Sequence, residues 1–498
     1  MSGATPVRRR RLSKCVGDDL GIGKLADAQD VWITGVSTDS RKVRAGDLFI
    51  AIRGAAHDGH DFVEAAVSGG AAAVLVERDV RPSSVPVVKA ADTRQIAGRV
   101  AARFYDHPSR ALGCIGVTGT NGKTSVCHFA AALLSASANP AGYGGTLGWG
   151  FAGKNCATDL TTEDAVTVQR RLADLVSAGA QWVAMEASSH ALDQGRVADV
   201  DFDIAVFTNL TRDHLDYHGS MDSYAAAKRR LFEWPTLLSG VVNWDDPQGR
   251  IIFRERRAAL NLLRFGSTSD ADVTWSDLVF DEVGISGSLA TPWGVRAFRL
   301  PLIGEFNVAN FAAAAAAACL AGARIDDVAA GASHLSAPAG RMQFVRTPMR
   351  ALVVIDFAHT PDALVKALTA LRRHAHGRII CVFGCGGDRD PGKRPLMARA
   401  VESTADCAWV TSDNPRSEPP ADIAAQIVAG FQGRIEVEVE LDRARAIERA
   451  LAQASPSDVV LIAGKGHEAY QEIAGRRVPY RDVDVVRRVL EHPPGAAS

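Results

Sequence analysis

The sequence predicts an α/β protein of three domains with mostly parallel, doubly wound sheets. Its 498 residues are too many for one hydrophobic core. Short apolar runs typical of strands alternate with longer runs typical of helices, and this alternation favours strand–helix–strand units. A third observation is a glycine-rich loop near residue 120, which joins one such strand to one such helix.

The first hundred residues alternate apolar runs with turns. Three of these runs read DLFIAIRG, AAAVLVE and VPVVKA. Runs of this length between turn residues predict a small α/β domain, which we place at residues 1–110. The segment FYDHPSRAL around Pro108 is expected to link it to the next domain, because proline interrupts regular structure.

The middle of the chain, residues 111–341, continues the alternation. WVAMEAS, IAVFTNL and GVVNW have the apolar character of buried strands, and TVQRRLADLVSAGA and NFAAAAAAACLAGA have helical character. A mostly parallel, doubly wound central sheet is the arrangement that this pattern favours. The alanine-rich stretch near Asn310 is apolar, but its small side chains predict a helix packed inside the protein.

The last part of the chain, residues 342–498, predicts a Rossmann-like α/β domain. ALVVIDFA, RIICVFGCGG, CAWVTSD and DVVLIAGKG are four apolar runs that each end in a polar or glycine-rich turn. In open α/β sheets ligands bind at the carboxyl ends of the strands, so these turns are candidate binding loops.

The composition argues against several classes of protein. A hydrophobic content of 47% with 23% charged residues is ordinary for a globular protein. The net charge of −1 gives no reason to expect nucleic acid or an acidic membrane as a partner. No apolar segment follows the basic residues near the N-terminus, so no signal peptide is expected. Eight scattered cysteines predict reduced thiols in the cytoplasm; zinc is the weaker alternative, because their spacing does not supply four ligands.

The stretch GVTGTNGKTSV, residues 116–126, has the composition of a phosphate cradle. It follows the apolar run ALGCI and precedes the helix-like run CHFAAALL. The full Walker pattern requires glycine at position 117, where Val117 stands, so the cradle is the shorter segment 119–125. Glycines let backbone N–H groups approach phosphate oxygens, Lys123 supplies charge and Thr124 can bind Mg²⁺. The alternative is a tight strand–helix turn with an exposed lysine.

Two polar segments follow strands of the same region. Glu186 ends the apolar run in AMEASSH, where a carboxylate can hold a metal; taken alone, a surface or capping glutamate explains it equally well. The segment TNLTRDHLDYHG then contains Asp213, His214, Asp216 and His218. So many polar side chains after a strand favour a loop that binds a cation or an ionic ligand, and a hydrogen-bonded turn is the alternative.

Seven motifs occur along the chain in one order, and together they resemble the Mur ligase family of ATP-dependent amide-bond-forming enzymes. They are GTNGKTS, EASSH, TNLTRDHLDYHG, YAAAK, GEFNVANFAAAAA, GRMQ and DFAHTPDAL. The resemblance extends over residues 37–480, nearly the whole chain. STDSRKVRAGDLFIAIRG, FGCGGDRDPGKRPLM, SDNPRSE and AGKGHEAYQ narrow it to members that use 2,6-diaminopimelate. The central sheet would then carry a P-loop-like ATP site.

The resemblance implies a ligase of peptidoglycan precursor synthesis, and hence a role in cell-wall biogenesis, cell shape and the division cycle. It implies that ATP activates the D-glutamyl side-chain carboxylate of UDP-N-acetylmuramoyl-L-alanyl-D-glutamate as an acyl phosphate, which then reacts with meso-2,6-diaminopimelate. ATP and Mg²⁺ are the implied cofactors. We further expect a monomer in the cytoplasm, with no nucleic-acid partner and no membrane insertion.

The resemblance also assigns site residues, each carried over at a matching motif position. ATP would be held by Gly119, Thr120, Asn121, Gly122, Lys123, Thr124, Ser125, Asn310, Arg341 and Asp356. Mg²⁺ would be bound by Thr124, Glu186 and His214. The uridine-nucleotide dipeptide would be held by Thr38, Ser40, Ala55, Ala56, His57, Thr161, Thr162, Ser188, Gln194 and Arg196. The diamino acid would be held by Arg389, Asp413, Asn414, Pro415, Arg416, Gly464 and Glu468. The catalytic set would be Lys123, Lys228, His214 and Arg341.

Lys228 is a special case among these residues. The matching lysine of the family is carbamylated to N6-carboxylysine, which replaces a cation by a carboxylate that can face a metal. Without the resemblance, a solvated lysine on the helix YAAAKRRLF is the simpler interpretation. The sequence also departs from the family where Phe357 replaces the usual tyrosine of DYAHTP, and in the variable stretch at residues 55–57.

Two other functions compete with this one. A relative that adds glutamate to folate would share the ATP loop and the metal residues, but STDSRKVRAGDLFIAIRG and DNPR argue against it. A nucleotide-binding regulator without catalysis is the other, and the intact set Lys123, Glu186, His214 and Lys228 argues against that. The base that deprotonates the attacking amine is not assigned by the sequence.

Overall fold

The computed structural model describes residues 8–22, 25–26, 29–54, 57–80, 84–158, 160–282, 284–345 and 351–491. The chain divides by its contacts into two compact units. The first is Met1–Arg264 with Leu320–Ala323, and the second is Phe265–Cys319 with Arg324–Ser498. A mainly parallel sheet lies in each of the three predicted regions, which confirms the α/β class and the multi-domain architecture. The domain limits 1–110, 111–341 and 342–498 stay predictions.

The N-terminal region contains a four-stranded parallel sheet in the order β3-β4-β5-β6. Its strands are β3 (Gly35–Ser37), β4 (Asp47–Ile50), β5 (Ala73–Val76) and β6 (Val87–Lys89), and its helices are α1 (Val63–Ser68) and α2 (Thr93–Phe104). Strands β1 (Arg10–Arg11) and β2 (Trp32–Ile33) pair separately. All four residues of β5 are 0% exposed, as expected for a parallel strand covered on both faces.

The central sheet has eight strands in the order β10-β9-β8-β11-β7-β12-β13-β14. They are β7 (Gly113–Thr118), β8 (Ala141–Gly145), β9 (Gly148–Phe151), β10 (Lys154–Cys156), β11 (Trp182–Glu186), β12 (Ile204–Phe207), β13 (Ser239–Asn243) and β14 (Asn261–Phe265). The five strands β8, β11, β7, β12 and β13 pair in parallel, and β8, β9 and β10 form an antiparallel edge. Because β7 lies between β11 and β12, the segments that follow these three strands meet at one edge of the sheet.

Six helices belong to this region. They are α3 (Lys123–Ala136), α4 (Ala165–Ser177), α5 (Ser189–Asp193), α6 (Leu215–His218), α7 (Met221–Arg229) and α8 (Pro247–Arg256). Asp164 caps α4 by accepting hydrogen bonds from two backbone N–H groups of its first turn. The segment around Pro108, expected to be a linker, forms a short 3-10 helix at Pro108–Ala111.

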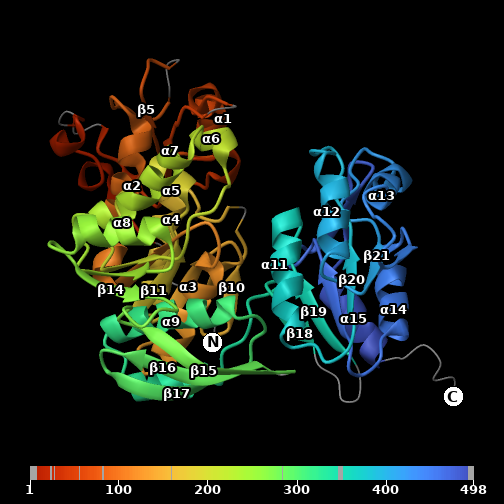
Figure 1. Ribbon diagram of the computed structural model, residues 1–498. Coiled ribbons are helices and arrows are strands. Elements are labelled where there is room, and N and C mark those ends of the chain that lie inside the picture. The colour runs from red at the N-terminus through yellow and green to blue at the C-terminus, as the bar shows by residue number, and fades with distance from the viewer. Residues whose placement is uncertain are drawn as a thin grey trace. The chain divides into compact units, whose positions relative to one another are not determined.

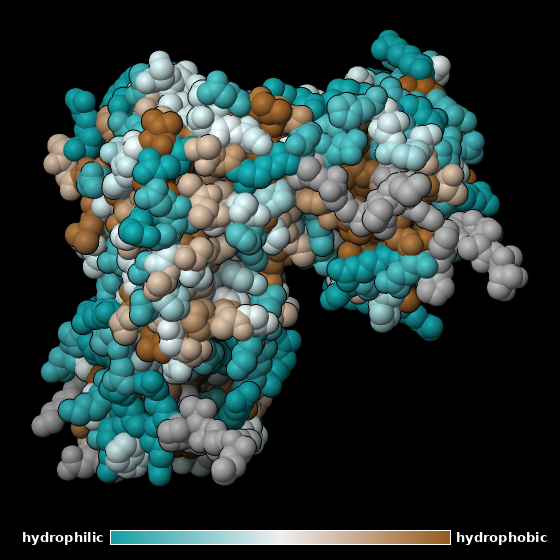
Figure 2. Space-filling view, turned by 90° about the horizontal axis from the view of Figure 1, so that it is seen from below, coloured by the Kyte–Doolittle hydropathy of each residue, from teal (hydrophilic) through white to brown (hydrophobic). Residues whose placement is uncertain are grey.

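The second unit begins with a three-stranded antiparallel sheet and two helices. These are β15 (Thr274–Asp281), β16 (Gly284–Thr291), β17 (Gly294–Leu300), α9 (Phe306–Leu320) and α10 (Ile325–Ala332). The seven alanines at 312–318 of α9 are each 0% exposed, which confirms a packed helix. No helix in the described part of the chain is long and apolar enough to cross a membrane. The face in Figure 2 mixes hydrophilic and hydrophobic residues.

The C-terminal sheet has six strands in the order β18-β19-β23-β20-β21-β22, and all but β18 pair in parallel. Its strands are β18 (Gln343–Val345), β19 (Leu352–Asp356), β20 (Ile379–Phe383), β21 (Cys407–Val410), β22 (Glu436–Val439) and β23 (Val459–Ala463). Its helices are α11 (Pro361–Arg372), α12 (Lys393–Glu402), α13 (Pro420–Val428), α14 (Arg443–Gln453) and α15 (Asp482–Glu491). A hairpin of β24 (Tyr470–Ile473) and β25 (Arg476–Pro479) follows β23.

Alternation along the strands assigns the helices to the two faces of this sheet. Cys381 of β20 points into the cluster formed with α11, α12 and α13, and its neighbour Val382 points into the cluster formed with α14 and α15. Figure 1 shows β20 and β21 running between α11 and α12 on one side and α14 on the other. Both faces are therefore covered, and binding loops are left at the strand ends.

Candidate active site

The phosphate loop joins β7 to α3, as the sequence predicts. Gly119 and Gly122 have φ values of 149° and 86°, a conformation that favours glycine. A Cβ on Gly119 would lie 1.9 Å from Oγ1 of Thr208, so no larger residue fits. The first turn of a helix has backbone N–H groups without partners inside the helix, so the start of α3 is suitable for an anion.

Lys123 lies folded over this loop. Its Nζ donates to the carbonyl oxygens of Gly119 and Thr120, at 2.9 and 3.0 Å. The side chain is half-buried, so the alternative of an exposed lysine on a simple turn is wrong. These two hydrogen bonds hold the ammonium against the backbone of the loop.

Thr124 and Glu186 meet beside the loop. Oγ1 of Thr124 donates to Oε1 of Glu186 at 2.9 Å, and the backbone N–H of Thr146 donates to the same oxygen at 2.8 Å. Glu186 is 2% exposed, so it is neither a surface nor a capping residue. A buried carboxylate whose hydrogen bonds come from two neutral threonines, next to a hydroxyl, matches the oxygen ligands that Mg²⁺ prefers.

His214, the third predicted metal ligand, caps α6 with φ of 52°. Its ring lies 4.9 Å from the His190 ring and 6.0 Å from the Tyr224 ring, centroid to centroid. Among the residues that the structure describes, no three His, Cys, Asp or Glu side chains are arranged to hold a metal ion. A metal site formed by Thr124, Glu186 and His214 would therefore need further oxygens, such as those of the substrate, to complete the coordination of the ion.

The polar segment after β12 forms α6 instead of an open loop. Tyr217 donates its hydroxyl to Asp193 at 2.8 Å, and Nε2 of His218 lies 3.0 Å from Oγ of Ser189. Asp193 and Ser189 both belong to α5. The two contacts therefore agree with the alternative prediction for this segment, a hydrogen-bonded turn.

Lys228 is 1% exposed, so the alternative of a solvated surface lysine is wrong. Its Nζ donates to the carbonyl oxygen of Gly119 at 2.8 Å and lies 4.4 Å from the centre of the Tyr224 ring. Burial, and after it the charge of Lys123, holds the pKa of the Lys228 ammonium well below its ordinary value, while Asp213 acts in the opposite direction. A low pKa favours the neutral amine, which is the form that reacts with carbon dioxide.

Five of the predicted uridine-nucleotide residues are linked near the end of β11. Oγ1 of Thr162 donates to the backbone oxygen of Glu186 at 2.7 Å and accepts from the N–H of Ser188 at 3.2 Å. Arg196 donates to the backbone oxygen of Thr162 at 2.9 Å and to the side chain of Gln194 at 3.0 Å. Thr161 joins through its hydroxyl, 3.1 Å from that of Thr146.

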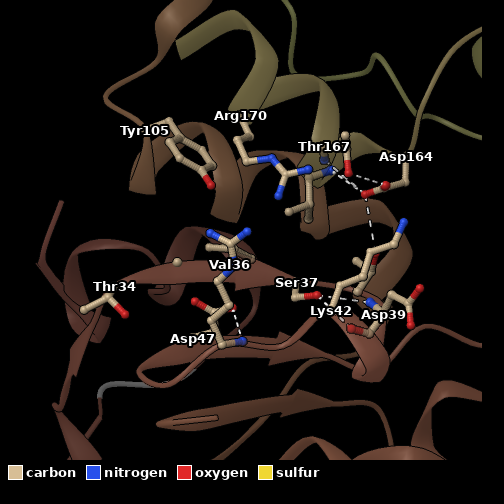
Figure 3. A pocket seen from close by; sticks show the side chains of 14 residues that line it. Thr34, Val36, Ser37, Asp39, Lys42, Asp47, Tyr105, Asp164, Thr167 and Arg170 are labelled. Atoms are coloured by element: carbon tan, nitrogen blue, oxygen red, sulfur yellow. Dashed lines mark hydrogen bonds between the residues drawn. The ribbon is translucent and has the colours of Figure 1, made fainter. Parts of the chain in front are cut away.

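Thr38 lines a cavity of about 340 Å³ between β3 and the start of α4. Figure 3 shows Arg170 and Thr167 of α4 facing Val36 and Ser37 of β3 across it. Ser40 and His57 do not line this cavity, and Ala55 and Ala56 lie outside the described residues.

The cavity is lined by three cationic side chains and three carboxylates, and one of the carboxylates pairs with an arginine outside the lining. Asp39 pairs with Arg41, Asp47 accepts from a backbone N–H, and Asp164 caps α4. The cationic side chains of the lining are Lys42, Arg44 and Arg170, and none forms an ion pair within the described residues. Sequence reasoning missed all three; the basic run SRKVR hinted at two of them, and Arg170 carried no signal.

Two predicted nucleotide residues lie together in the second unit. Asp356, at the end of β19, accepts hydrogen bonds from the N–H groups of Met342 and Ala358, at 2.7 and 2.9 Å. Burial raises the pKa of Asp356. The guanidinium of Arg341 lies 5.1 Å from the centre of the Phe357 ring, so this phenylalanine supports the arginine without a hydroxyl. Asn310 lies on α9, where it donates to the side chain of Asn307 at 3.1 Å.

The predicted diamino-acid residues gather after β21 and β23. Nδ2 of Asn414 donates to Oε2 of Glu468 at 2.8 Å. A Cβ on Gly464, whose φ is 116°, would lie 2.4 Å from Oδ2 of Asp413, so glycine permits this approach. Pro415 is buried between Asn414 and Arg416.

The two arginines of this set both lie close to Gly386. Arg416 donates to the carbonyl oxygen of Gly387 at 2.6 Å, and its Nε is 3.8 Å from a carboxylate oxygen of Glu472. A Cβ on Gly386 would lie 2.9 Å from Nη1 of Arg416 and 4.0 Å from Cγ of Arg389. Sequence reasoning missed Lys465, which contacts both Asn414 and Glu468; its place between two glycines after a buried strand was the available signal.

The fold and the site define the chain as an enzyme that binds a nucleoside triphosphate, because the loop, Lys123 and Glu186 meet at one edge of a parallel sheet. Comparison with known proteins makes the class specific, and the chain belongs to the Mur ligase family. Three family models match it. They are the Mur ligase family catalytic domain at residues 32–106, the Mur ligase middle domain at 117–318, and the Mur ligase glutamate ligase domain at 340–466.

Individual relatives are similar over almost the whole chain. The UDP-N-acetylmuramoyl-L-alanyl-D-glutamate–2,6-diaminopimelate ligase of Coxiella burnetii is 46% identical over 484 residues, 94% of this chain and 99% of the relative. The ligase of the same name from Ectopseudomonas mendocina is 48% identical over 457 residues, 91% of this chain and 94% of the relative. A solved structure of a ligase with this name superposes with a TM-score of 0.70 at 38% identity, covering 94% of this chain and 97% of that one.

Proposed function

We propose that the chain is an ATP-dependent ligase that adds meso-2,6-diaminopimelate to UDP-N-acetylmuramoyl-L-alanyl-D-glutamate. The amide forms at the side-chain carboxylate of the D-glutamyl residue. The observation that carries the proposal is that one chain, 46–48% identical to ligases of this name, contains both a phosphate loop and the turn Asp413–Asn414–Pro415–Arg416, the sequence DNPR.

The reaction has two steps. The glutamyl carboxylate attacks the γ-phosphorus of ATP, which gives an acyl phosphate and ADP. The amine of the diamino acid then attacks the acyl carbon, and the tetrahedral intermediate expels inorganic phosphate as the amide forms. Because the substrate carboxylate is the nucleophile, the protein contributes position and positive charge through Lys123 and Arg341.

The metal and the modified lysine extend this proposal. Thr124, Glu186 and His214 would hold Mg²⁺, and Thr124 and Glu186 already form an oxygen-rich pair. The bound ion would neutralise phosphate charge. A carbamate on Lys228 would place an anion beside the loop, where a protonated amine would repel both Lys123 and the metal.

The cavity beside β3 gives the uridine nucleotide its charged partners. We assign the diphosphate of the substrate to Lys42, Arg44 and Arg170, with Thr38 at the same cavity. Thr162, Ser188 and Arg196 would then hold the dipeptide near the carboxylate that reacts. A monomer in the cytoplasm, without nucleic acid, completes the proposal.

A screen of phosphate release tests the proposed function. Release should require ATP, the uridine-nucleotide dipeptide and meso-2,6-diaminopimelate together. Release with a folate and glutamate would support the competing glutamate ligase, and nucleotide binding without any release would support a regulator.

A further inference from the structure

Lys465 lies in a turn between two glycines directly after β23. Gly464 and Gly466 have φ values of 116° and 52°. A Cβ on Gly464 would lie 2.4 Å from Oδ2 of Asp413, and a Cβ on Gly466 would lie 2.8 Å from the carbonyl oxygen of Gly340. Positive φ and these close neighbours favour glycine at both positions, and between them Lys465 is 0% exposed.

The buried ammonium of Lys465 is paired with two of the proposed diamino-acid residues. Its Nζ donates to Oδ1 of Asn414 and to Oε2 of Glu468, each at 2.9 Å. Burial of an ammonium is costly unless a carboxylate and further acceptors compensate it, and these two contacts supply both. The centre of the Tyr470 ring lies 5.7 Å from Nζ.

This pairing orients the residues that would meet the ligand. Oδ1 of Asn414 also accepts from the backbone N–H of Glu472 at 3.0 Å, so its amide nitrogen must point to Glu468, to which it donates at 2.8 Å. Among the residues that the structure describes, both hydrogen bonds to the Glu468 carboxylate are accepted by Oε2, and its side chain is 23% exposed. Oε1 is therefore the oxygen left for an ammonium of the ligand.

We infer that Lys465 determines which diamino acid the enzyme accepts, by neutralising Glu468; this inference rests on the function proposed above. Both meso-2,6-diaminopimelate and L-lysine carry an ammonium at the far end, and only diaminopimelate adds a carboxylate there. Lys465 repels the ammonium of either ligand and attracts the carboxylate of one. It thus favours a zwitterionic end, whose carboxylate Arg416 also attracts, over a lone ammonium.

Charge removal at this position tests the inference. At an effective dielectric constant of about 20, a unit charge about 6 Å away changes an equilibrium constant by roughly 100-fold, and partial solvent screening reduces this. Lys465→Met should therefore lower the ratio of kcat/KM for diaminopimelate to that for L-lysine by at least ~10-fold. Glu468→Gln should raise the same ratio, because it leaves the Lys465 charge uncompensated.

The matched control is Lys366→Met, which removes an exposed lysine that pairs with Asp362 on α11. It should leave the ratio unchanged. A purely structural role for Lys465 predicts that both amino acids lose activity together, with no change in the ratio.

Each outcome decides a separate question. If Lys465→Met fails to fold, the direction of the Glu468→Gln ratio still decides, and a fall or no change overturns the inference. A wild-type enzyme that prefers diaminopimelate, combined with unchanged ratios in both variants, overturns the inference alone. A wild-type enzyme that takes neither amino acid overturns the proposed function and this inference with it.

Discussion

Replacement of Lys228 by methionine separates a catalytic role from a structural one. Methionine has a similar length and no charge, so Lys228→Met keeps the packing of a side chain that is 1% exposed. Loss of an anionic group beside the phosphate loop should reduce kcat by about 10²–10³. The stability of the folded protein should not fall with it.

The expected stability follows from the burial of the amine. Each unit by which the folded protein lowers the pKa of Lys228 costs about 1.4 kcal/mol of stability at neutral pH, because the unfolded lysine binds a proton there. The hydrogen bond to the Gly119 carbonyl contributes only about 1 kcal/mol. In buffer depleted of carbon dioxide, Lys228→Met should therefore be as stable as the wild type or more stable.

The pH dependence has a definite sign. In the window from the lowered pKa of folded Lys228 up to the ordinary lysine pKa of about 10.4, the unfolded state binds more protons than the folded state. The lysine therefore contributes a stability that rises with pH across this window, and Lys228→Met should lack this contribution. Thermal unfolding at several pH values measures the difference between the two proteins.

Phosphate release and carbon-13 spectroscopy complete the assay. With ¹³C-labelled bicarbonate, the wild type should show a carbamate signal that Lys228→Met lacks, and added short-chain carboxylate should partly restore turnover to Lys228→Ala. Full turnover in Lys228→Met, together with a loss of stability, would refute the reasoning and leave Lys228 as a structural residue.

Three other substitutions test separate parts of the site. Lys123→Ala should abolish phosphate release with an unchanged fold by circular dichroism, a loss of about 3 kcal/mol or more of transition-state stabilisation; near-normal kcat would contradict the phosphate loop. Arg416→Ala should remove most of the preference for meso-2,6-diaminopimelate over L-lysine, a preference that can reach ~10⁴ in kcat/KM in the wild type, and equal wild-type values for the two amino acids would contradict the proposed specificity. Arg170→Ala should raise KM for the uridine-nucleotide dipeptide roughly 10-fold without changing KM for ATP. An unchanged KM for the dipeptide would contradict the assignment of the diphosphate to the cavity beside β3.

Local features of the sequence determined the parts of the fold that depend on neighbouring residues. The apolar run before Gly119 and the helix-like run after Ser125 predicted β7, the loop and α3. Glycine spacing and hydrophobic periodicity are patterns among residues close together in the sequence, so they can be read without the tertiary structure. The alanines of α9 predicted a packed helix for the same reason, and the structure confirms it. The sequence likewise predicted the DNPR turn that follows β21.

Tertiary structure decided which distant residues meet. Thr124 and Glu186 are 62 positions apart and come together because β7 and β11 are parallel neighbours. The burial of Lys228 depends on a contact with Gly119, 109 positions away, so the sequence alone favoured a surface lysine.

The same limit explains the residues that sequence reasoning missed. Arg170 faces β3 across a cavity that two separate regions of the chain enclose, and Lys465 reaches Asn414 across 51 positions. Hydrophobic patterns record which face of a strand or helix is buried, and they carry no information about which buried polar group will lie opposite. The order and register of the strands supply that information, and they arise only when the whole sheet forms.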